Sequence, residues 1–309
     1  MRPIILNAHS KVNLHLAVGG RLPNALHNIE SIFTTLSLHD TLEIRFGDEE
    51  NAVDDVSMNA SALPPLFAAP LEALPREKNI VCAALRLFRA KTGFKRDVSI
   101  AVRKRVPSGA GLGGGSADAA AVLRALFSVL PDGGFAELET MAAELGSDVP
   151  FFLRGGAALV EGFGERILPI DGRTLHFVVV TPEFSSDTGR AYRLLDQFRE
   201  KNGPSTYKPF DFLIPAFYGE IGRWPFFNDF LPVFMEAGSA EEREGYGAIL
   251  GALRETGALF CGLSGSGSAC FGVFSSREAA LKAEAALSRG FIFARAAFSV
   301  TQAGTWGGK

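Results

Sequence analysis

A glycine-rich segment in the first half of the chain constrains its fold more than any other feature. Five of the seven residues in 109–115 are glycine; an alternating apolar segment at 98–102, which predicts a strand, precedes them, and an alanine- and leucine-rich segment at 116–130 predicts a helix after them. Ser116 is expected to cap that helix. Glycine backbone can adopt positive φ and bring its N–H groups against a ligand, while a helix N-terminus adds partial positive charge. The segment therefore predicts a phosphate-binding loop, with a flexible, ligand-free loop as the alternative.

Three well-known glycine loops do not fit this segment. A Walker A loop ends in Gly-Lys-Ser/Thr, whereas Gly115 is followed directly by Ser116. Residues 109–114 spell the G-x-G-x-x-G of dinucleotide-binding folds, and Asp132 follows at a suitable distance, but no second strand separates the helix from that aspartate. A protein kinase loop requires downstream H-R-D and D-F-G motifs, which the sequence lacks. A different kind of phosphate-binding fold is therefore indicated.

Net charge, cysteine spacing and hydropathy exclude several other classes of protein. The 31 basic and 34 acidic residues give a net charge of −3, so no broad basic face is available to bind nucleic acid. Cys82, Cys261 and Cys270 lie far apart and form no CxxC pair, which argues against a disulfide framework or a structural metal site. The sequence has no apolar run of about eighteen residues. It also lacks the apolar core of a signal peptide, so we expect no membrane span and a cytoplasmic location.

The length and the order of predicted elements indicate two domains. The 309 residues correspond to two domains at about 150 residues each, and the pattern breaks around Pro169. We therefore predict domains 1–168 and 169–309. The second is expected to be an α+β unit with helices on one face of a mainly antiparallel sheet, and residues 48–78 are expected to form loops. The remaining predicted elements are strands at 12–18, 41–46, 151–153, 157–160, 177–180, 259–261, 269–274 and 291–300, and helices at 80–89, 135–145, 189–200, 241–256 and 275–290.

Three segments together resemble the motifs of the GHMP kinase superfamily, which includes galactokinase, homoserine kinase and mevalonate kinase. They are Lys-Val-Asn-Leu at 11–14, the glycine-rich segment at 107–120, and Leu-Ser-Gly-Ser-Gly at 263–267. The resemblance spans nearly the whole chain. It implies an α+β fold with two domains: an N-terminal ATP-binding domain like domain 2 of ribosomal protein S5, and a C-terminal substrate domain built as a ferredoxin-like α/β sandwich.

Further segments are similar to one branch of that superfamily, the kinases of the non-mevalonate isoprenoid pathway that act on a cytidine-diphosphate-linked methylerythritol. The resemblance implies that the γ-phosphoryl group of ATP is transferred to the tertiary 2-hydroxyl of this small molecule, with Mg²⁺ as the expected metal ion. The alternatives are a GHMP kinase acting on another small alcohol and a non-catalytic nucleotide-binding relative. The segments are His27, Asp-Thr-Leu at 40–42, Gly-Ser-Asp-Val-Pro at 146–150, Glu-Gly-Phe-Gly-Glu at 161–165 and Asn-Asp at 228–229.

The resemblance also implies roles in catalysis and in ATP binding. Asp148 is expected to accept the proton of the substrate hydroxyl, and Lys11 to lie beside it, where an ammonium stabilises the developing alkoxide. Taken alone, Asp148 would be interpreted as a turn or cap residue and Lys11 as an exposed strand residue. The expected ATP-binding residues are Pro107, Ser108, Gly109, Ala110, Gly111, Leu112, Gly113, Gly114, Gly115 and Ser116.

A second set of residues is implied to bind the substrate: Asn13, His27, Thr188, Tyr192, Gly265, Ser266 and Gly267. His27 matches a histidine that hydrogen-bonds the cytosine, but the family usually has a tyrosine just before it, where this chain has Leu26. Loss of an aromatic partner from one face of a base is worth about 1–3 kcal/mol. We therefore expect Tyr192 to supply the remaining stacking face. Beyond these small molecules no partner is expected, and the chain is predicted to be a monomer or a homodimer.

Overall fold

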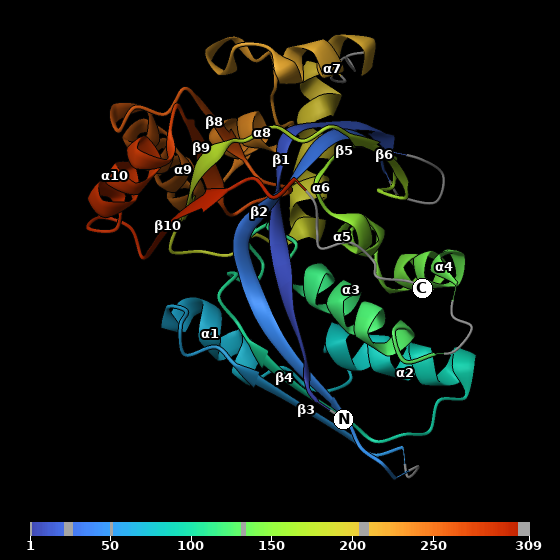
Figure 1. The fold of residues 1–309 in the computed structure, drawn as a ribbon. Coiled ribbons are helices and arrows are strands. Elements are labelled where there is room, and N and C mark those ends of the chain that lie inside the picture. The colour runs from blue at the N-terminus through green and yellow to red at the C-terminus, as the bar shows by residue number, and fades with distance from the viewer. Residues whose placement is uncertain (1, 22–26, 50–51, 131–133, 204–209, 302–309) are drawn as a thin grey trace.

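Two very long strands run side by side through the centre of the molecule. The computed structural model describes residues 2–21, 27–49, 52–130, 134–203 and 210–301. Strands β1 (Ile4–Arg21) and β2 (His27–Phe46) pair antiparallel along almost their full lengths (Figure 1). Their register shifts between His9 and Lys11 and again between Asn13 and His15. Such irregularities are common beside active sites, where they re-aim side chains.

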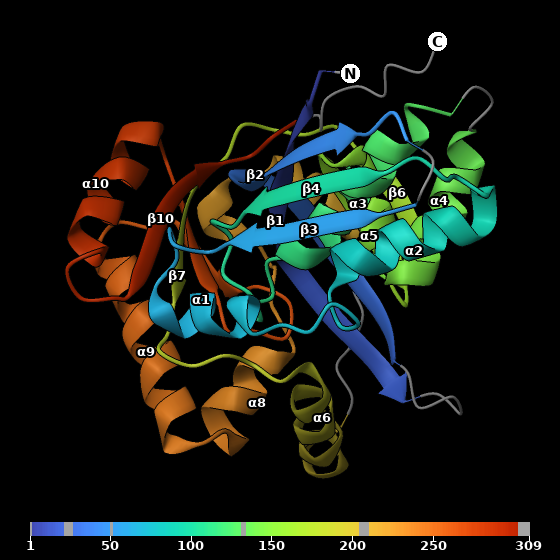
Figure 2. The ribbon, with the colours of Figure 1, turned by 90° about the horizontal axis from the view of Figure 1, so that it is seen from below.

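The first sheet is built around β2. Its strands are β3 (Asp54–Asn59), β4 (Val98–Arg103), β5 (Ala157–Gly162) and β6 (Arg166–Ile170), in the order β3-β4-β2-β5-β6, with β1 also paired to β2. The C-terminal part of β2 pairs with β4 and its N-terminal part with β5. One face of the sheet is covered by α2 (Ile80–Thr92), α3 (Gly114–Phe127), α4 (Phe135–Leu145) and α5 (Val149–Arg154), as Figure 2 shows from below.

The second sheet carries helices on one face and packs its other face against the first sheet. It consists of β7 (His176–Thr181), β8 (Phe260–Leu263), β9 (Cys270–Phe274) and β10 (Phe293–Phe298), in the order β10-β7-β9-β8 with every pair antiparallel. Val178 and Val180 pack against helices, whereas Phe177 and Val179 face the first sheet, as the alternation along a strand requires. The antiparallel sheet with helices on one face is thus confirmed. The helices are α6 (Thr188–Asn202), α8 (Phe230–Ala237), α9 (Ala240–Glu255) and α10 (Arg277–Leu287).

One apolar core joins the two sheets. Val12 and Leu14 of β1 belong to the same buried cluster as Phe177 of β7 and Phe271 of β9. Helix α7 (Phe210–Tyr218), at the top of Figure 1, adds Leu213 and Phe217 to this cluster. A large apolar interface holds two parts of a chain in a fixed relation, so residues that the two halves contribute to a shared site are held in register.

Several local predictions differ from the structure. Residues 48–78, expected to be loops, contain β3 and the short helix α1 (Pro65–Glu72), which begins with proline in its first turn. Residues 151–153, expected to be a strand, lie in α5, because a short apolar run has no period that separates strand from helix. The helix predicted at 275–290 begins at Arg277, and its N-cap is Ser276, whose Oγ accepts from Ala279 N at 3.1 Å.

The change from one sheet to the other occurs after β6. That strand ends at Ile170, two residues after the predicted end of the first domain, and β7 begins at His176. The domain boundary between residues 168 and 169 stays a prediction. Among the helices that the structure describes, none has the length and apolarity to cross a membrane.

Candidate active site

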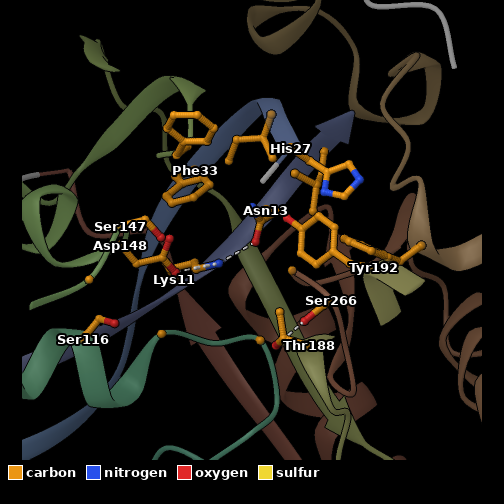
Figure 3. A pocket seen from close by; sticks show the side chains of 18 of the residues that line it. Lys11, Asn13, His27, Phe33, Ser116, Ser147, Asp148, Thr188, Tyr192 and Ser266 are labelled. Atoms are coloured by element: carbon orange, nitrogen blue, oxygen red, sulfur yellow. Dashed lines mark hydrogen bonds and ion pairs between the residues drawn. The ribbon is translucent and has the colours of Figure 1, made fainter. Parts of the chain in front are cut away.

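A cavity of about 340 Å³ lies where segments from both halves of the chain meet (Figure 3). Its walls come from β1 and β2, the glycine-rich loop, the segment before α5, helix α6 and residues 265–266. A concave pocket of this size with convergent polar groups is the usual place for a ligand. The sequence-predicted residues that line it are Lys11, Asn13, His27, Gly111, Gly113, Ser116, Asp148, Thr188, Tyr192, Gly265 and Ser266.

Lys11 and Asp148 face each other in this cavity. Lys11 Nζ lies 3.5 Å from Asp148 Oδ2, and the two side chains are 5% and 28% exposed. Asp148 immediately precedes α5 but makes no side-chain capping hydrogen bond. Its carboxylate is turned toward the ammonium (Figure 3). Asp148 lies in a turn before α5, as one alternative predicted, but its side chain does not cap the helix.

The ammonium of Lys11 is held in place by its neighbours. Nζ donates to Asn13 Oδ1 at 2.6 Å and lies 4.6 Å from the ring centroid of Phe33, a cation–π distance. Asn13 Nδ2 in turn donates to Ser31 Oγ at 2.9 Å, and Ser31 Oγ donates to the carbonyl of His15. Lys11 and Asn13 share one face of β1 because side chains alternate along a strand. This network orients Lys11 toward Asp148.

Two glycine loops interlock behind the cavity. Gly111 has a φ of +71°, and a Cβ at this position would lie only 2.1 Å from the carbonyl oxygen of Ser264. Ser264 Oγ donates to the carbonyl of Gly111 at 2.8 Å. Only glycine permits both the left-handed conformation and this close approach. The loop at residues 109–115 therefore forms one unit with the loop at residues 262–268, which contains the Leu-Ser-Gly-Ser-Gly segment at 263–267.

Helix α3 starts differently from the sequence prediction. It begins at Gly114, and its N-cap is Gly113, which has a φ of 70° and no side chain to cap with. Ser116 therefore lies inside the first turn and does not cap the helix; its side chain lines the cavity instead. The N–H groups of a helix's first turn have no partner within the helix. They are suited to binding an anion placed in the cavity.

Polar side chains hold the 262–268 loop from behind. Asn228 Nδ2 donates to the carbonyls of Leu263 and Gly265, both at 2.8 Å. The hydroxyls of Thr188 and Ser266 are 2.9 Å apart. Asn228 belonged to one of the family-like segments, but no role was predicted for it, because its partners are distant in the sequence.

At the end of the cavity away from the glycine-rich loop, His27 meets helix α6. The rings of His27 and Tyr192 are stacked, with centroids 4.9 Å apart and an interplanar angle of 30°. His27 Nε2 lies 2.8 Å from Asp196 Oδ1. Phe230 packs edge-on against Tyr192 at 5.0 Å. Asp196 was missed by the sequence analysis, although its spacing of four residues from Tyr192 places both side chains on one face of a helix.

Three buried charged side chains lie beneath the start of the glycine-rich loop. Lys104 Nζ donates to Asp40 and, at 2.6 Å, to Asp118 Oδ2, and none of the three side chains is more than 3% exposed. Asp40 Oδ1 also accepts from the backbone N–H groups of Arg105 and Val106, just before the loop. Burial would lower the pKa of Lys104, but the two carboxylates raise it. Burial raises the pKa of Asp118 to about 7.

The raised pKa of Asp118 predicts a pH dependence of stability. Between about pH 4 and pH 7 the folded chain holds a proton that an aspartate of ordinary pKa 3.8 releases on unfolding. This contribution to the unfolding free energy is complete below about pH 4 and is lost as the pH rises through about 7, by up to roughly 1 kcal/mol per pH unit. In urea denaturation, the wild type should lose stability relative to Asp118→Asn between pH 5 and pH 8. The unfolding free energy of the wild type minus that of Asp118→Asn should therefore decrease over this pH range. If it stays constant or increases, this assignment is contradicted.

The other predicted site residues do not line the cavity. Ala110 and Leu112 are buried in the core between the sheets, where they anchor the glycine-rich loop. Leu26 and Asp132 lie outside the described residues. The remaining predicted residues that do not line the cavity are Pro107, Ser108, Gly109, Gly114, Gly115 and Gly267.

Comparison with known proteins finds similarity in both halves of the chain. Residues 79–156 match the family described as GHMP kinases N terminal domain, and residues 213–292 match GHMP kinases C terminal. A 4-diphosphocytidyl-2-C-methyl-D-erythritol kinase of Anaeromyxobacter sp. (strain Fw109-5) is 37% identical over 279 residues, covering 89% of this chain and 84% of that protein. The protein of the same name from Treponema pallidum (strain Nichols) is 35% identical over 300 residues, covering 94% and 96%.

Solved structures are similar over nearly the full length. A crystal structure of 4-(cytidine 5'-diphospho)-2C-methyl-D-erythritol kinase has a TM-score of 0.78 at 29% identity, covering 96% of this chain and 99% of that one. The L. major mevalonate kinase in complex with R-mevalonate has a TM-score of 0.66 at 16% identity, covering 98% and 97%. The second likeness is one of fold alone.

Proposed function

This chain belongs to the GHMP kinases, and from that premise we propose that it phosphorylates the 2-hydroxyl of 4-diphosphocytidyl-2-C-methyl-D-erythritol with ATP, in the non-mevalonate isoprenoid pathway. Relatives named for this substrate match almost the whole chain. The observation that carries the proposal is that one cavity holds the Lys11–Asp148 pair together with both the glycine-rich loop and the His27–Tyr192 pair.

The chemistry follows from the two charged groups in the cavity. Asp148 accepts the proton of the substrate hydroxyl as its oxygen attacks the γ-phosphorus, the new O–P bond forms, and the bond to the β-phosphate breaks to release ADP. Lys11, 3.5 Å from the carboxylate, stabilises the negative charge that develops on the attacking oxygen. Asn13 holds the ammonium in place for this task.

We assign ATP binding to the glycine-rich loop and the first turn of α3. Backbone N–H groups of this turn are suited to the phosphate oxygens, and the Ser116 hydroxyl lines the same cavity. Within the described residues no group of three or more His, Cys, Asp or Glu side chains could hold a metal by itself. Mg²⁺ typically needs only one or two protein oxygens when phosphates supply other ligands. We propose that Mg²⁺ accompanies ATP; the Ser116 hydroxyl, which lines the cavity, would be available to hold it, and the ion would supply positive charge that neutralises the phosphates.

The cytidine end of the substrate fits the His27–Tyr192 pair. A base that hydrogen-bonds to the edge of the imidazole lies roughly in its plane. Because that plane is only 30° from the ring of Tyr192, such a base would lie nearly parallel to the tyrosine ring, which is the orientation that stacking requires. Tyr192 thus supplies the one aromatic face that we expect in a chain with Leu26 before His27.

A kinase assay with several alcohols tests the proposal. The purified chain, ATP and Mg²⁺ are offered the cytidine-linked substrate, homoserine, mevalonate or galactose, and ADP release is followed. We expect turnover with the cytidine-linked substrate alone. Turnover only of another alcohol would show a GHMP kinase with a different substrate, and no turnover of any would favour a non-catalytic relative.

Other properties of the chain follow from the same proposal. We place the ATP-binding domain in residues 1–168 and the substrate domain in 169–309, with both contributing to the cavity. A cytoplasmic location and a monomeric or homodimeric state remain predictions from the sequence.

A further inference from the structure

Helix α6 presents a stripe of polar side chains to the cavity and to the end of the long β1–β2 pair. Thr188, Tyr192 and Asp196 follow at intervals of four residues and therefore share one face of the helix. Two of them contact the same histidine: Tyr192 stacks on the ring of His27, and Asp196 lies 2.8 Å from its Nε2. The His27 side chain is 4% exposed and that of Asp196 is 28% exposed. This contact has no part in phosphoryl transfer as described above.

The contact determines which imidazole nitrogen carries a proton. An ionised carboxylate can only accept hydrogen bonds, so Nε2 of His27 must be the protonated nitrogen. In the neutral ring, Nδ1 is then an acceptor. The hydrogen bond made by one ring nitrogen thus sets the role of the other.

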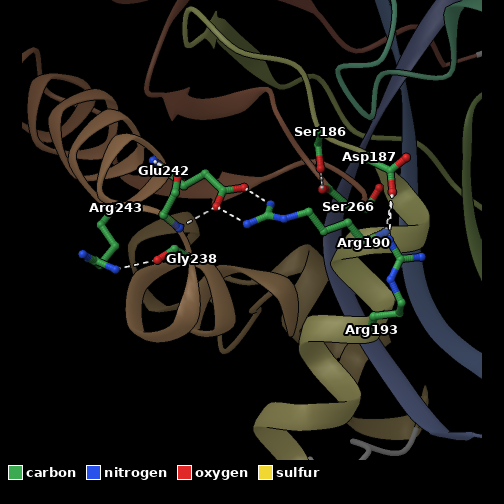
Figure 4. Close-up of polar contacts among 9 residues, drawn as sticks. Ser186, Asp187, Arg190, Arg193, Gly238, Glu242, Arg243 and Ser266 are labelled. Atoms are coloured by element: carbon green, nitrogen blue, oxygen red, sulfur yellow. Dashed lines mark hydrogen bonds and ion pairs between the residues drawn. The ribbon is translucent and has the colours of Figure 1, made fainter.

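Helix α6 is anchored on both sides of Asp196. Near its start, the Arg190 guanidinium donates to both carboxylate oxygens of Glu242, at 2.5 and 2.8 Å, and Glu242 also caps helix α9 (Figure 4). Near its end, Arg199 donates to Asp229 Oδ2 at 2.8 Å and to the carbonyls of Val18 and Gly19. Helix α6, and with it Asp196, is therefore held against β1 and α9 by charged contacts that do not involve a ligand.

We propose that Asp196 is a positioning residue that holds His27 in the tautomer with Nε2 protonated, so that the pocket selects a pyrimidine with an exocyclic amino group over one with a carbonyl there. The inference rests on the proposed function, which places the base at this end of the cavity. Cytosine presents N4–H₂ as a donor to the Nδ1 lone pair, whereas a pyrimidine with O4 presents an acceptor. An acceptor facing an acceptor loses the hydrogen bond and leaves both groups unsatisfied.

Binding of two nucleotides that differ only in this group tests the selection without requiring turnover. Calorimetry at pH 8.5, where imidazole side chains are normally neutral, should show that the wild type binds cytidine 5'-diphosphate about tenfold or more tightly than uridine 5'-diphosphate. In Asp196→Asn the amide can accept from Nε2 or donate to it, so both tautomers form and the ratio should fall to within about threefold. The control is Glu200→Gln, an exposed carboxylate on the same helix, which should keep the wild-type ratio.

Nitrogen-15 NMR of histidine-labelled protein gives a readout that a merely structural role would not move. The signals of His27 are identified as those that are absent from the spectrum of His27→Gln. In the wild type they should show a protonated Nε2 and an unprotonated Nδ1. In Asp196→Asn they should show a mixture of the two tautomers. A protonated Nδ1 in the wild type, equal binding of the two nucleotides, or an unchanged ratio in Asp196→Asn would overturn the inference. If the ratio and the tautomer are as expected but no alcohol is phosphorylated, the proposed function fails and the inference stands.

Discussion

Replacing Asp148 by asparagine is expected to lower kcat by about 10²–10⁴-fold, the usual contribution of a positioned general base. The asparagine has nearly the same shape but cannot accept the hydroxyl proton as a carboxylate does. Because the Asp148 side chain caps no helix and is partly exposed, the fold should be unaffected. The measurement is ADP release at saturating ATP and substrate, with the unfolding transition recorded beside it.

A matched control for this variant is Asp211→Asn, which removes an exposed carboxylate from α7, away from the cavity. Its turnover should equal that of the wild type. Near-wild-type turnover in Asp148→Asn would exclude Asp148 as the base.

Lys11→Met should also lower kcat strongly, because it removes the ammonium and keeps most of the buried side-chain volume. If the two groups serve one proton transfer, the double variant should be little worse than the slower single variant.

The candidate catalytic residues could be picked out through the resemblance to a known family, because that resemblance depends on residue types in a fixed order along the chain; their roles stay predictions. The glycine-rich loop, Lys11 and Asp148 were found in this way, and the structure places all three around one cavity. Local geometry was predicted less well. Ser116 had the residue type of a cap, but the left-handed conformation of Gly113 starts the helix before it.

Contacts between distant segments could not be predicted from patterns. Asp196 and His27 are 169 residues apart, and nothing near Asp196 in the sequence indicates a histidine partner. The helical spacing from Tyr192 would have placed the carboxylate on the correct face of α6, but not against β2. Lys104 likewise looks like an ordinary exposed basic residue in sequence, although it lies buried between two carboxylates.

The buried position of Lys104 leads to the largest expected change in stability. Lys104→Met should lower the unfolding free energy by about 3–5 kcal/mol, the usual cost of removing one partner from a buried ion pair. Asp40 and Asp118 would then face each other, fully buried, without the ammonium between them. Asp118→Asn is the matched comparison, since it keeps the Lys104–Asp40 pair, and it should cost much less. Urea denaturation at pH 7 measures both.

The same variants separate a structural role of this cluster from an effect on nucleotide binding. Asp40 accepts from the N–H groups of the two residues that lead into the glycine-rich loop, and Asp118 lies on α3 just after it. Loss of Lys104 should therefore raise the KM for ATP more than that for the alcohol substrate. In Lys104→Met/Asp118→Asn only one carboxylate remains buried, still bonded to those N–H groups, so part of the lost stability should return. A loss below about 1 kcal/mol in Lys104→Met, or an equal loss in Asp118→Asn, would mean that the ammonium does not hold the cluster together.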